Sequence, residues 1–259
     1  MDTQVLVDGG IVLQAHLARP QASAAGADRT RSGLVLAHGF PSGPKGAATA
    51  AATLPDLADR LAADAGWVVL ALSLRGTGAS GGEFSLSGWL ADLRAGVDRL
   101  LAEEDVSGVW LAGFSTGGSL AICLAAQDGR VRGVAAFGAP ADFDDWASDP
   151  KRFAEHARSV GVLATRHSSA QFDAWSQELR QHRPVHEIQA IPPRPILLVH
   201  GAEDEEVPMV DARALADAAD GQVELRIITG AGHQLRHDPR AVAILLGWLE
   251  RQAVTPAEL

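Results

Sequence analysis

A serine between two glycines is the first residue of this sequence that could act as a catalytic nucleophile. Ser115 lies at the centre of Gly113–Gly117, a G-x-S-x-G pattern that directly follows the apolar run Val109–Ala112 and directly precedes a helix-like segment. A tight strand-to-helix turn would hold Ser115 in a strained conformation with positive φ and expose its hydroxyl at the helix N-terminus. Glycines on both sides would avoid a collision across that turn. The pattern therefore predicts a nucleophilic serine.

A serine hydroxyl is a poor nucleophile at neutral pH and needs a histidine base, which in turn needs a carboxylate to orient it. His233 directly follows Gly232, just after the last predicted strand, Val223–Thr229. His237 is the alternative, but it adjoins Asp238, which is placed to cap the next helix. His233 is therefore the predicted base.

The orienting carboxylate is expected after the predicted strand Pro195–His200. Four acidic residues follow one another there, Glu203, Asp204, Glu205 and Glu206, so position alone does not choose among them. A short side chain on a turn suits a rigid hydrogen bond to an imidazole, which favours Asp204. The three glutamates are expected to form a solvated acidic loop.

The elements that must position these residues follow from the spacing of apolar residues. An opening hairpin, turned at residues 8–10, precedes apolar runs that alternate with helix-like segments. The later predicted strands are 34–37, 67–74, 109–112, 134–137, 195–200 and 223–229, and the predicted helices are 55–65, 87–103, 116–126, 210–219 and 239–251. This alternation predicts an α/β fold with a mainly parallel, doubly wound sheet.

Residues 139–191 break the alternation, because their apolar and aromatic residues are spaced like those of short helices. We interpret this segment as a small helical cap, inserted before the strand that carries the acid. The core is then formed by residues 1–138 and 192–259.

Composition excludes several classes of protein. A length of 259 residues suits one large α/β domain, and a net charge of −10 argues against nucleic-acid binding. Cys123 is the only cysteine, so neither an internal disulfide nor a cysteine zinc cluster is expected, and a cytoplasmic location fits. The sequence has neither a signal-peptide pattern nor an apolar run of membrane-spanning length. We therefore expect no membrane partner.

Together these motifs resemble the α/β-hydrolase family. The matching segments, in the family's Ser…Asp…His order, are His38-Gly39-Phe40, Gly113–Gly117, Gly201-x-x-Asp204-x-x-Val207-Pro208 and Gly230–His233. In addition, residues 75–84 resemble the R-G-x-G-x-S-x-G-x-F motif of the cinnamoyl/feruloyl-esterase-like and acyl-aminoacyl-peptidase-like branches. Those esterases often read H-G-F-T-G-x-K, whereas this chain has two prolines, Pro41 and Pro44, after Phe40.

The resemblance implies a serine carboxylesterase that hydrolyses small to medium acyl or aryl esters through an acyl-enzyme on Ser115. Asp204 and His233 would complete the catalytic triad, and the backbone N–H groups of Phe40 and Thr116 would form the oxyanion hole. For substrate binding we single out Phe40, Trp146 and Val207.

Other activities stay open at this point. An acyl-peptidase, a thioesterase or a C–C bond hydrolase could use the same triad, and a non-catalytic ligand-binding protein is a more distant alternative. The G-x-G-x-x-G of residues 76–81 does not directly open a helix, and the histidines lack the spacing of metal ligands. We therefore expect no cofactor and no metal, a small-molecule ester as substrate, and a monomer or homodimer.

Overall fold

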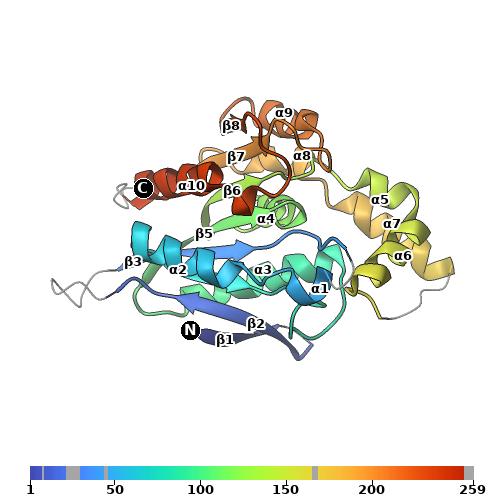
Figure 1. The fold of residues 1–259 in the computed structure, drawn as a ribbon, viewed down its shortest axis with the longest axis horizontal. Coiled ribbons are helices and arrows are strands. Elements are labelled where there is room, and N and C mark those ends of the chain that lie inside the picture. The colour runs from blue at the N-terminus through green and yellow to red at the C-terminus, as the bar shows by residue number, and fades with distance from the viewer. Residues whose placement is uncertain (8, 22–29, 44–45, 165–168, 254–259) are drawn as a thin grey trace.

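An eight-stranded, mostly parallel sheet forms the centre of the structure (Figure 1). The computed structural model describes residues 1–7, 9–21, 30–43, 46–164 and 169–253. The strands lie in the order β1-β2-β4-β3-β5-β6-β7-β8. β1 and β2 form an antiparallel hairpin, β2 is antiparallel to β4, and all other neighbours are parallel. The strands are β1 Asp2–Val7, β2 Ile11–Ala18, β3 Arg31–Ala37, β4 Val68–Leu72, β5 Val106–Phe114, β6 Val131–Phe137, β7 Ile196–Gly201 and β8 Glu224–Ile228.

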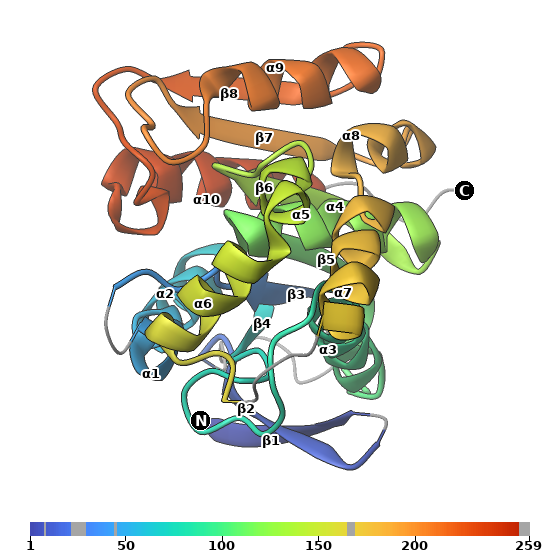
Figure 2. The same cartoon turned by 90° about the vertical axis from the view of Figure 1, so that its right-hand side faces the viewer.

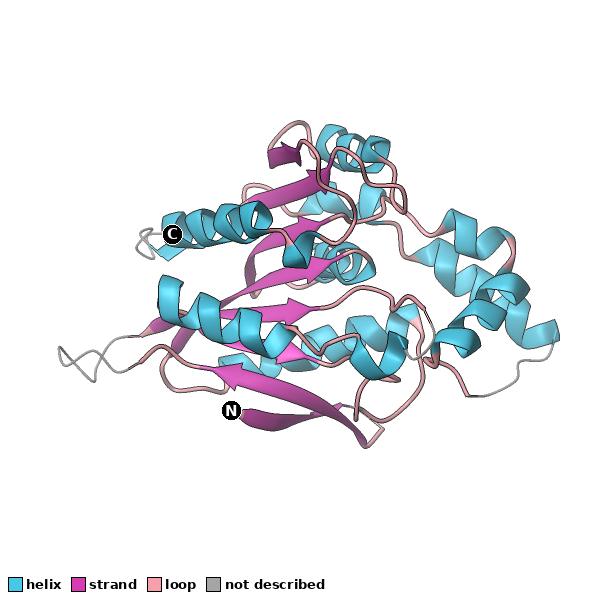
Figure 3. Ribbon diagram, in the orientation of Figure 1, coloured by secondary structure: helices cyan, strands magenta, loops and turns pink. Residues whose placement is uncertain are grey.

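Helices cover both faces of this sheet, as the predicted alternation requires (Figure 3). Along β3, Leu34 and Leu36 belong to an apolar cluster shared with α2 and α10, whereas Val35 and Ala37 belong to a second cluster shared with α3 and α4. Successive side chains of a strand point to opposite faces, so both layers are anchored on the same strands. The helices of these layers are α1 Gly46–Thr49, α2 Leu54–Ala65, α3 Leu86–Leu101, α4 Thr116–Gln127, α9 Met209–Ala218 and α10 Pro239–Ala253.

The segment between β6 and β7 is helical. Its helices α5, α6 and α7 lie beyond the carboxyl ends of the parallel strands, whereas α8 and η1 pack beside α4 and α9 on one face of the sheet (Figures 1 and 2). It contains α5 Asp144–Ser148, α6 Pro150–Val160, α7 Ser169–Gln181, α8 Pro184–Glu187 and the 3-10 turn η1 Ile188–Ala190. Its apolar side chains pack on one another, with Trp146 stacked on Phe153 at a ring-centroid distance of 4.1 Å. The helical content predicted for residues 139–191 is confirmed for the described part. Asp8 of the predicted hairpin turn and Pro44 lie outside the described residues.

A buried ion pair joins the end of β4 to α3. Asp92 is fully buried and accepts hydrogen bonds from the backbone N–H of Arg75 at 2.8 Å and from its guanidinium at 2.9 and 2.6 Å. Burial raises the pKa of Asp92, and the bonds from Arg75 oppose that rise. The pair fixes the segment after β4 near the carboxyl edge of the sheet, where the loops described below meet.

No described helix is long and apolar enough to cross a membrane.

Candidate active site

The turn between β5 and α4 has the strained geometry predicted for a nucleophile. Ser115 has φ 51° and ψ −129°, and it is one of two described non-glycine residues with positive φ. A β-carbon on Gly113 would lie 2.3 Å from the Gly117 carbonyl oxygen, and one on Gly117 would lie 2.2 Å from the His38 carbonyl oxygen. Only glycine fits at these positions, so the predicted crowding across the turn is confirmed.

Asp204 and His233 meet at the carboxyl edge of the sheet, although 29 residues separate them in the sequence. The Asp204 Oδ2 atom lies 2.8 Å from His233 Nδ1. Two backbone hydrogen bonds join their loops, from Ala202 N–H to the Ile228 oxygen and from Glu203 N–H to the Ala231 oxygen. The carboxylate therefore holds one ring nitrogen of His233 and leaves Nε2 facing the cavity.

The electrostatics of this pair suit a base and its orienting acid. Burial raises the pKa of Asp204, but hydrogen bonds from His233 and from the backbone N–H groups of Val207 and Glu206 outweigh burial and hold that pKa below its usual value. Burial lowers the pKa of His233, but the bond and charge of Asp204, with the charge of Glu206, raise it above its usual value overall. Asp204 therefore favours its ionised form, and His233 takes up a proton more readily than a free imidazole does.

The loop after β3 passes directly over Ser115. A β-carbon on Gly39 would lie 2.6 Å from Ser115 Cβ. The side chain of His38 holds this loop in place by two hydrogen bonds. Its Nε2 accepts from the Leu74 N–H at 3.1 Å, so the ring proton is on Nδ1, which donates to the Gly39 oxygen at 2.8 Å. Burial lowers the pKa of His38 to about 4, so this ring is neutral at physiological pH.

Two backbone N–H groups beside Ser115 are free to bind an oxyanion. Neither the N–H of Phe40 nor that of Thr116 donates to any described group of the protein. Thr116 directly follows Ser115 in the chain. Phe40 directly follows Gly39, where an added β-carbon would lie 2.6 Å from Ser115 Cβ. Unpaired donors at the start of a helix and in a fixed loop are the arrangement that stabilises a developing negative charge.

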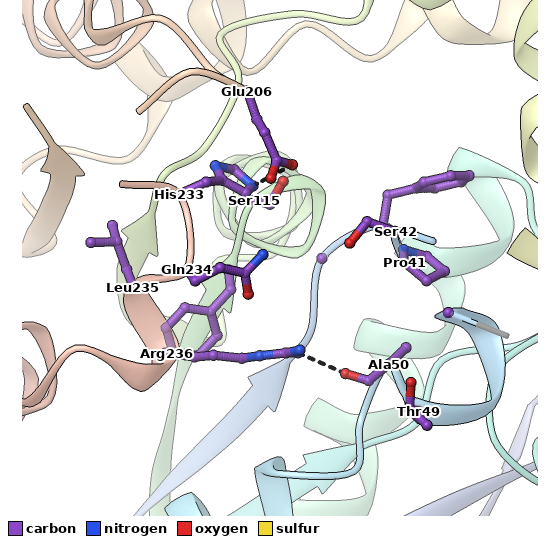
Figure 4. A pocket seen from close by; sticks show the side chains of 14 residues that line it. Pro41, Ser42, Thr49, Ala50, Ser115, Glu206, His233, Gln234, Leu235 and Arg236 are labelled. Atoms are coloured by element: carbon purple, nitrogen blue, oxygen red, sulfur yellow. Dashed lines mark hydrogen bonds and ion pairs between the residues drawn. The ribbon is translucent and has the colours of Figure 1, made fainter. Parts of the chain in front are cut away.

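Two cavities meet at Ser115 and His233. The smaller, with a volume of about 90 Å³, lies between the loop after β3, the helix α1 with the residue Ala50 that follows it, and the turn η2 (Leu235–His237) (Figure 4). The larger, of about 440 Å³, extends toward α5 and α6. Phe40, Trp146 and Val207, the predicted substrate-binding residues, all line the larger cavity. The Phe40 ring packs on Trp146 at 5.0 Å and on Phe153 at 5.2 Å, so it joins the loop after β3 to the helical segment.

Sequence reasoning missed two charged residues of this site. Glu203, Glu205 and Glu206 are all exposed, as expected of an acidic loop, but Glu206 also lines both cavities and its Oε2 lies 3.7 Å from His233 Nε2. Arg236 lines the smaller cavity. Neither Glu206 nor Arg236 is part of the motifs that predicted Ser115 and His233 as catalytic residues. The sequence indicates them only by position, since Glu206 lies close to Asp204 and Arg236 lies close to His233. The alternative base, His237, is exposed and contacts Arg236.

The contact between Glu206 and His233 makes a prediction about pH dependence. Since the carboxylate helps to raise the pKa of His233, Glu206→Gln lowers that pKa and leaves more neutral base at acid pH. We expect the acid limb of kcat/KM against pH to move to lower pH by a fraction of a pH unit, because a partly exposed pair contributes little.

The matched control is Glu205→Gln, which removes an equal charge from the neighbouring position that does not line either cavity. Salt at 1 M should reduce the difference between wild type and Glu206→Gln. An acid limb that moves equally in the two variants would show that only the overall charge matters.

No group of three or more His, Cys, Asp or Glu side chains among the described residues is placed to hold a metal ion. Cys123 is buried on α4, and burial raises the pKa of its thiol, so it is no second nucleophile.

Comparisons with known proteins identify the family and the fold of this chain. The profile of the prolyl oligopeptidase family matches residues 57–255, and a search of curated proteins finds no match. The structure is similar to that of the α/β hydrolase GrgF from Penicillium sp. sh18, with a TM-score of 0.73, 20% identity and coverage of 98% of this chain and 99% of that chain. It is also similar to Est1E from Butyrivibrio proteoclasticus with ferulic acid bound (TM-score 0.71, 20% identity, coverage 96% and 97%).

A third similar structure is the esterase PF2001 from Pyrococcus furiosus, with a TM-score of 0.69, 18% identity and coverage of 98% of this chain and 91% of that chain. Since these similarities extend over nearly the whole of each chain, the α/β-hydrolase fold predicted from the sequence is confirmed. At such identities the similarity concerns the fold alone, because one fold can carry many different chemistries.

Proposed function

Because the chain belongs to the prolyl oligopeptidase family and is a serine hydrolase, we propose that it is a carboxylesterase with Ser115 as nucleophile. The observation that carries this proposal is the convergence of three loops on one strained serine. Ser115 has φ 51°, His233 lies beside it with its Nδ1 held by Asp204, and both Ser115 and His233 line the same two cavities (Figure 4).

The proposed reaction follows from the roles that these positions allow. His233 takes the Ser115 proton at Nε2 while Oγ attacks the ester carbonyl, and the N–H groups of Phe40 and Thr116 bind the oxyanion. The intermediate then collapses, the C–O bond to the alcohol breaks, and His233 protonates the departing alcohol. In the second half, His233 takes a proton from water, which attacks the acyl-enzyme and releases the acid and Ser115. Asp204 keeps the base in one tautomer and stabilises its charged form throughout.

The larger cavity supports an acyl or aryl ester of small to medium size. Its wall is formed partly by aromatic side chains, and it has room for a group larger than acetyl. We also propose that residues 139–191 act as a cap, because Phe143 and Trp146 of that segment line this cavity. Action on small-molecule esters in the cytoplasm, as a monomer or homodimer, stays a prediction.

The second candidate is an acyl-peptidase that uses the same residues, and the name of the family favours it. An amide would need protonation of a poorer leaving group by His233, with no change in the nucleophile. A cleft that accepts an ester accepts the corresponding anilide, so only relative rates separate the two activities.

The test is a panel of initial rates. We expect 4-nitrophenyl esters from acetate to decanoate, together with methyl ferulate, to be hydrolysed with an optimum at short to medium chains, and the matching 4-nitroanilides to react more slowly. Activity on ferulate would favour aryl esters. Faster hydrolysis of the anilides would replace the esterase by the peptidase, and a folded protein inactive on every ester would overturn the esterase proposal.

A further inference from the structure

The smaller cavity contains a positive charge that the reaction above does not use. We propose that this cavity is an anion subsite in which the Arg236 guanidinium binds a carboxylate that the substrate carries on a short arm beside its scissile ester. The inference rests on the proposed esterase function, since it specifies the substrate class of the same site.

Within the described residues, two hydrogen bonds hold the Arg236 guanidinium at the cavity. Arg236 belongs to η2, three residues after His233, so the base and the charge are placed by one loop. Its Nη1 donates to the Ala50 oxygen at 2.7 Å, across 186 residues of sequence, and its Nε contacts His237 Nε2 at 3.0 Å. Figure 4 shows the guanidinium reaching from η2 toward Ala50 along the lower side of the cavity.

The charge of Arg236 has no counter-ion among the described residues. Burial lowers its pKa and no neighbouring carboxylate opposes that effect, yet a guanidinium remains charged at neutral pH. Arg194 provides a contrast within this protein. It also forms no ion pair with a described residue, but it is satisfied by carbonyl groups, namely those of Asp128, Val131, Ala190 and Ile191.

An unpaired, partly buried guanidinium is stabilised when an anion enters the cavity beside it. No described group accepts a hydrogen bond from Nη2 of Arg236, so this nitrogen can still donate. Carboxylates are the natural ligands, because guanidinium donors match their two oxygens. A substrate carboxylate would therefore supply the missing charge.

The sizes of the two cavities define the substrate further. About 90 Å³ suits a short arm and excludes a bulky ring system, whereas the larger cavity of about 440 Å³ has an aromatic wall. Both open at Ser115, so the two halves of one ester would extend in different directions from the scissile bond. We infer a substrate with a short anionic half and a bulkier apolar or aryl half.

Glu206 makes the two ends of the smaller cavity opposite in charge. Its carboxylate lies at His233 Nε2, 3.7 Å away, and Figure 4 shows it at the opposite end of the cavity from Arg236. A substrate carboxylate is repelled at the Glu206 end and attracted at the Arg236 end. The anionic arm is thereby oriented before the reaction.

The experiment compares anionic esters with neutral esters of the same shape. In the first arm the carboxylate is on the acyl side, and 4-nitrophenyl hemiglutarate is compared with 4-nitrophenyl 5-methylhexanoate. In the second it is on the alcohol side, and the phenylacetyl ester of glycolic acid is compared with isobutyl phenylacetate. We expect wild type to prefer the anionic member of one pair by kcat/KM.

Arg236→Gln should reduce that preference by roughly 10- to 150-fold, as expected for a lost charge-assisted hydrogen bond. The rate on the neutral member serves as the reference, so the ratio of the two rates measures the anionic preference separately from any change at Ser115 and His233. Arg236→Lys should fall between wild type and Arg236→Gln. Arg240→Gln is the matched control, because Arg240 is exposed, paired with Asp238 and four residues away. It should keep the wild-type preference.

The outcomes separate this inference from the esterase proposal. Hydrolysis of the neutral esters without any anionic preference, or a preference unchanged in Arg236→Gln, overturns the subsite and leaves the esterase. If no ester is hydrolysed, calorimetry of phenyl hemiglutarate binding still tests the anion subsite. Weaker binding to Arg236→Gln than to wild type supports the subsite. Equal binding to the two proteins, or no binding to either, overturns it. The same measurement applies if Arg236→Gln does not fold, with Arg236→Lys in its place.

Discussion

Replacing Ser115 with alanine is expected to lower kcat on the best ester substrate by about 10⁵- to 10⁶-fold, the scale measured when a serine hydrolase loses its nucleophile. Alanine keeps the β-carbon, and a side chain at this position already tolerates φ 51°, so the turn between β5 and α4 stays intact. The residual rate would come from the oxyanion donors and from binding alone. Initial rates over a wide range of enzyme concentration, with circular dichroism to verify folding, measure this loss.

Ser119 provides the control for this substitution. It lies one turn further along α4, is fully buried, and donates its hydroxyl to the Pro140 oxygen at 2.6 Å. We expect a fluorophosphonate probe to label wild type and Ser119→Ala, and to leave Ser115→Ala unlabelled. Labelling of Ser115→Ala, or a loss of rate below about tenfold in a folded protein, would remove Ser115 from the mechanism.

The core of the fold could be predicted because its strands are buried on both faces. Such strands form continuous apolar runs, as Val68–Leu72 does, and the intervening helices carry apolar residues at helical spacing. The ends of the strands were less certain. β5 runs from Val106 to Phe114, longer than the predicted 109–112, because Gly108 pairs with Ser32 of β3 without being apolar and Val106 pairs with Arg31 beyond a shift in the register.

The candidate triad could be placed because each member follows a strand or lies in a glycine-rich turn. Parallel strands bring their carboxyl ends to one edge of a sheet, so residues after β5, β7 and β8 must be neighbours. The hydrogen bond between Asp204 and His233 is a direct consequence. The choice of Asp204 among four carboxylates rested on side-chain length, and its fully buried side chain agrees with that reasoning.

The walls of the cavities could not be predicted in the same way. Arg236 meets Ala50 across 186 residues, and Phe40 meets Phe153 through the packing of a loop on a helix. Such contacts depend on how loops and helices that are distant in sequence pack on one another. The spacing of apolar residues in the sequence does not predict this packing. The sequence therefore predicts which residues follow the ends of strands. The shape and charge of the binding site follow only from the three-dimensional structure.

The arrangement of Asp204 leads to the second large effect. Asp204→Asn is expected to lower kcat by about 10⁴-fold while leaving the protein folded. Asparagine keeps an oxygen for the N–H groups of Glu206 and Val207, which Asp204 Oδ1 accepts at 3.0 and 2.9 Å. Its amide nitrogen, however, would donate to His233 Nδ1, so the ring proton would move to Nε2. A ring protonated there cannot take the Ser115 proton, which is why a substitution of one atom has so large an effect.

Two observations should accompany the loss in Asp204→Asn. The bond and charge of Asp204 raise the pKa of His233, so without them that pKa falls, and the acid limb of the remaining activity moves to lower pH, further than in Glu206→Gln. Glu205→Gln, in the same loop, should keep the full rate. A loss below about tenfold in folded Asp204→Asn would mean that another carboxylate orients the base. Glu206 is then the next to test, although it faces Nε2 rather than Nδ1.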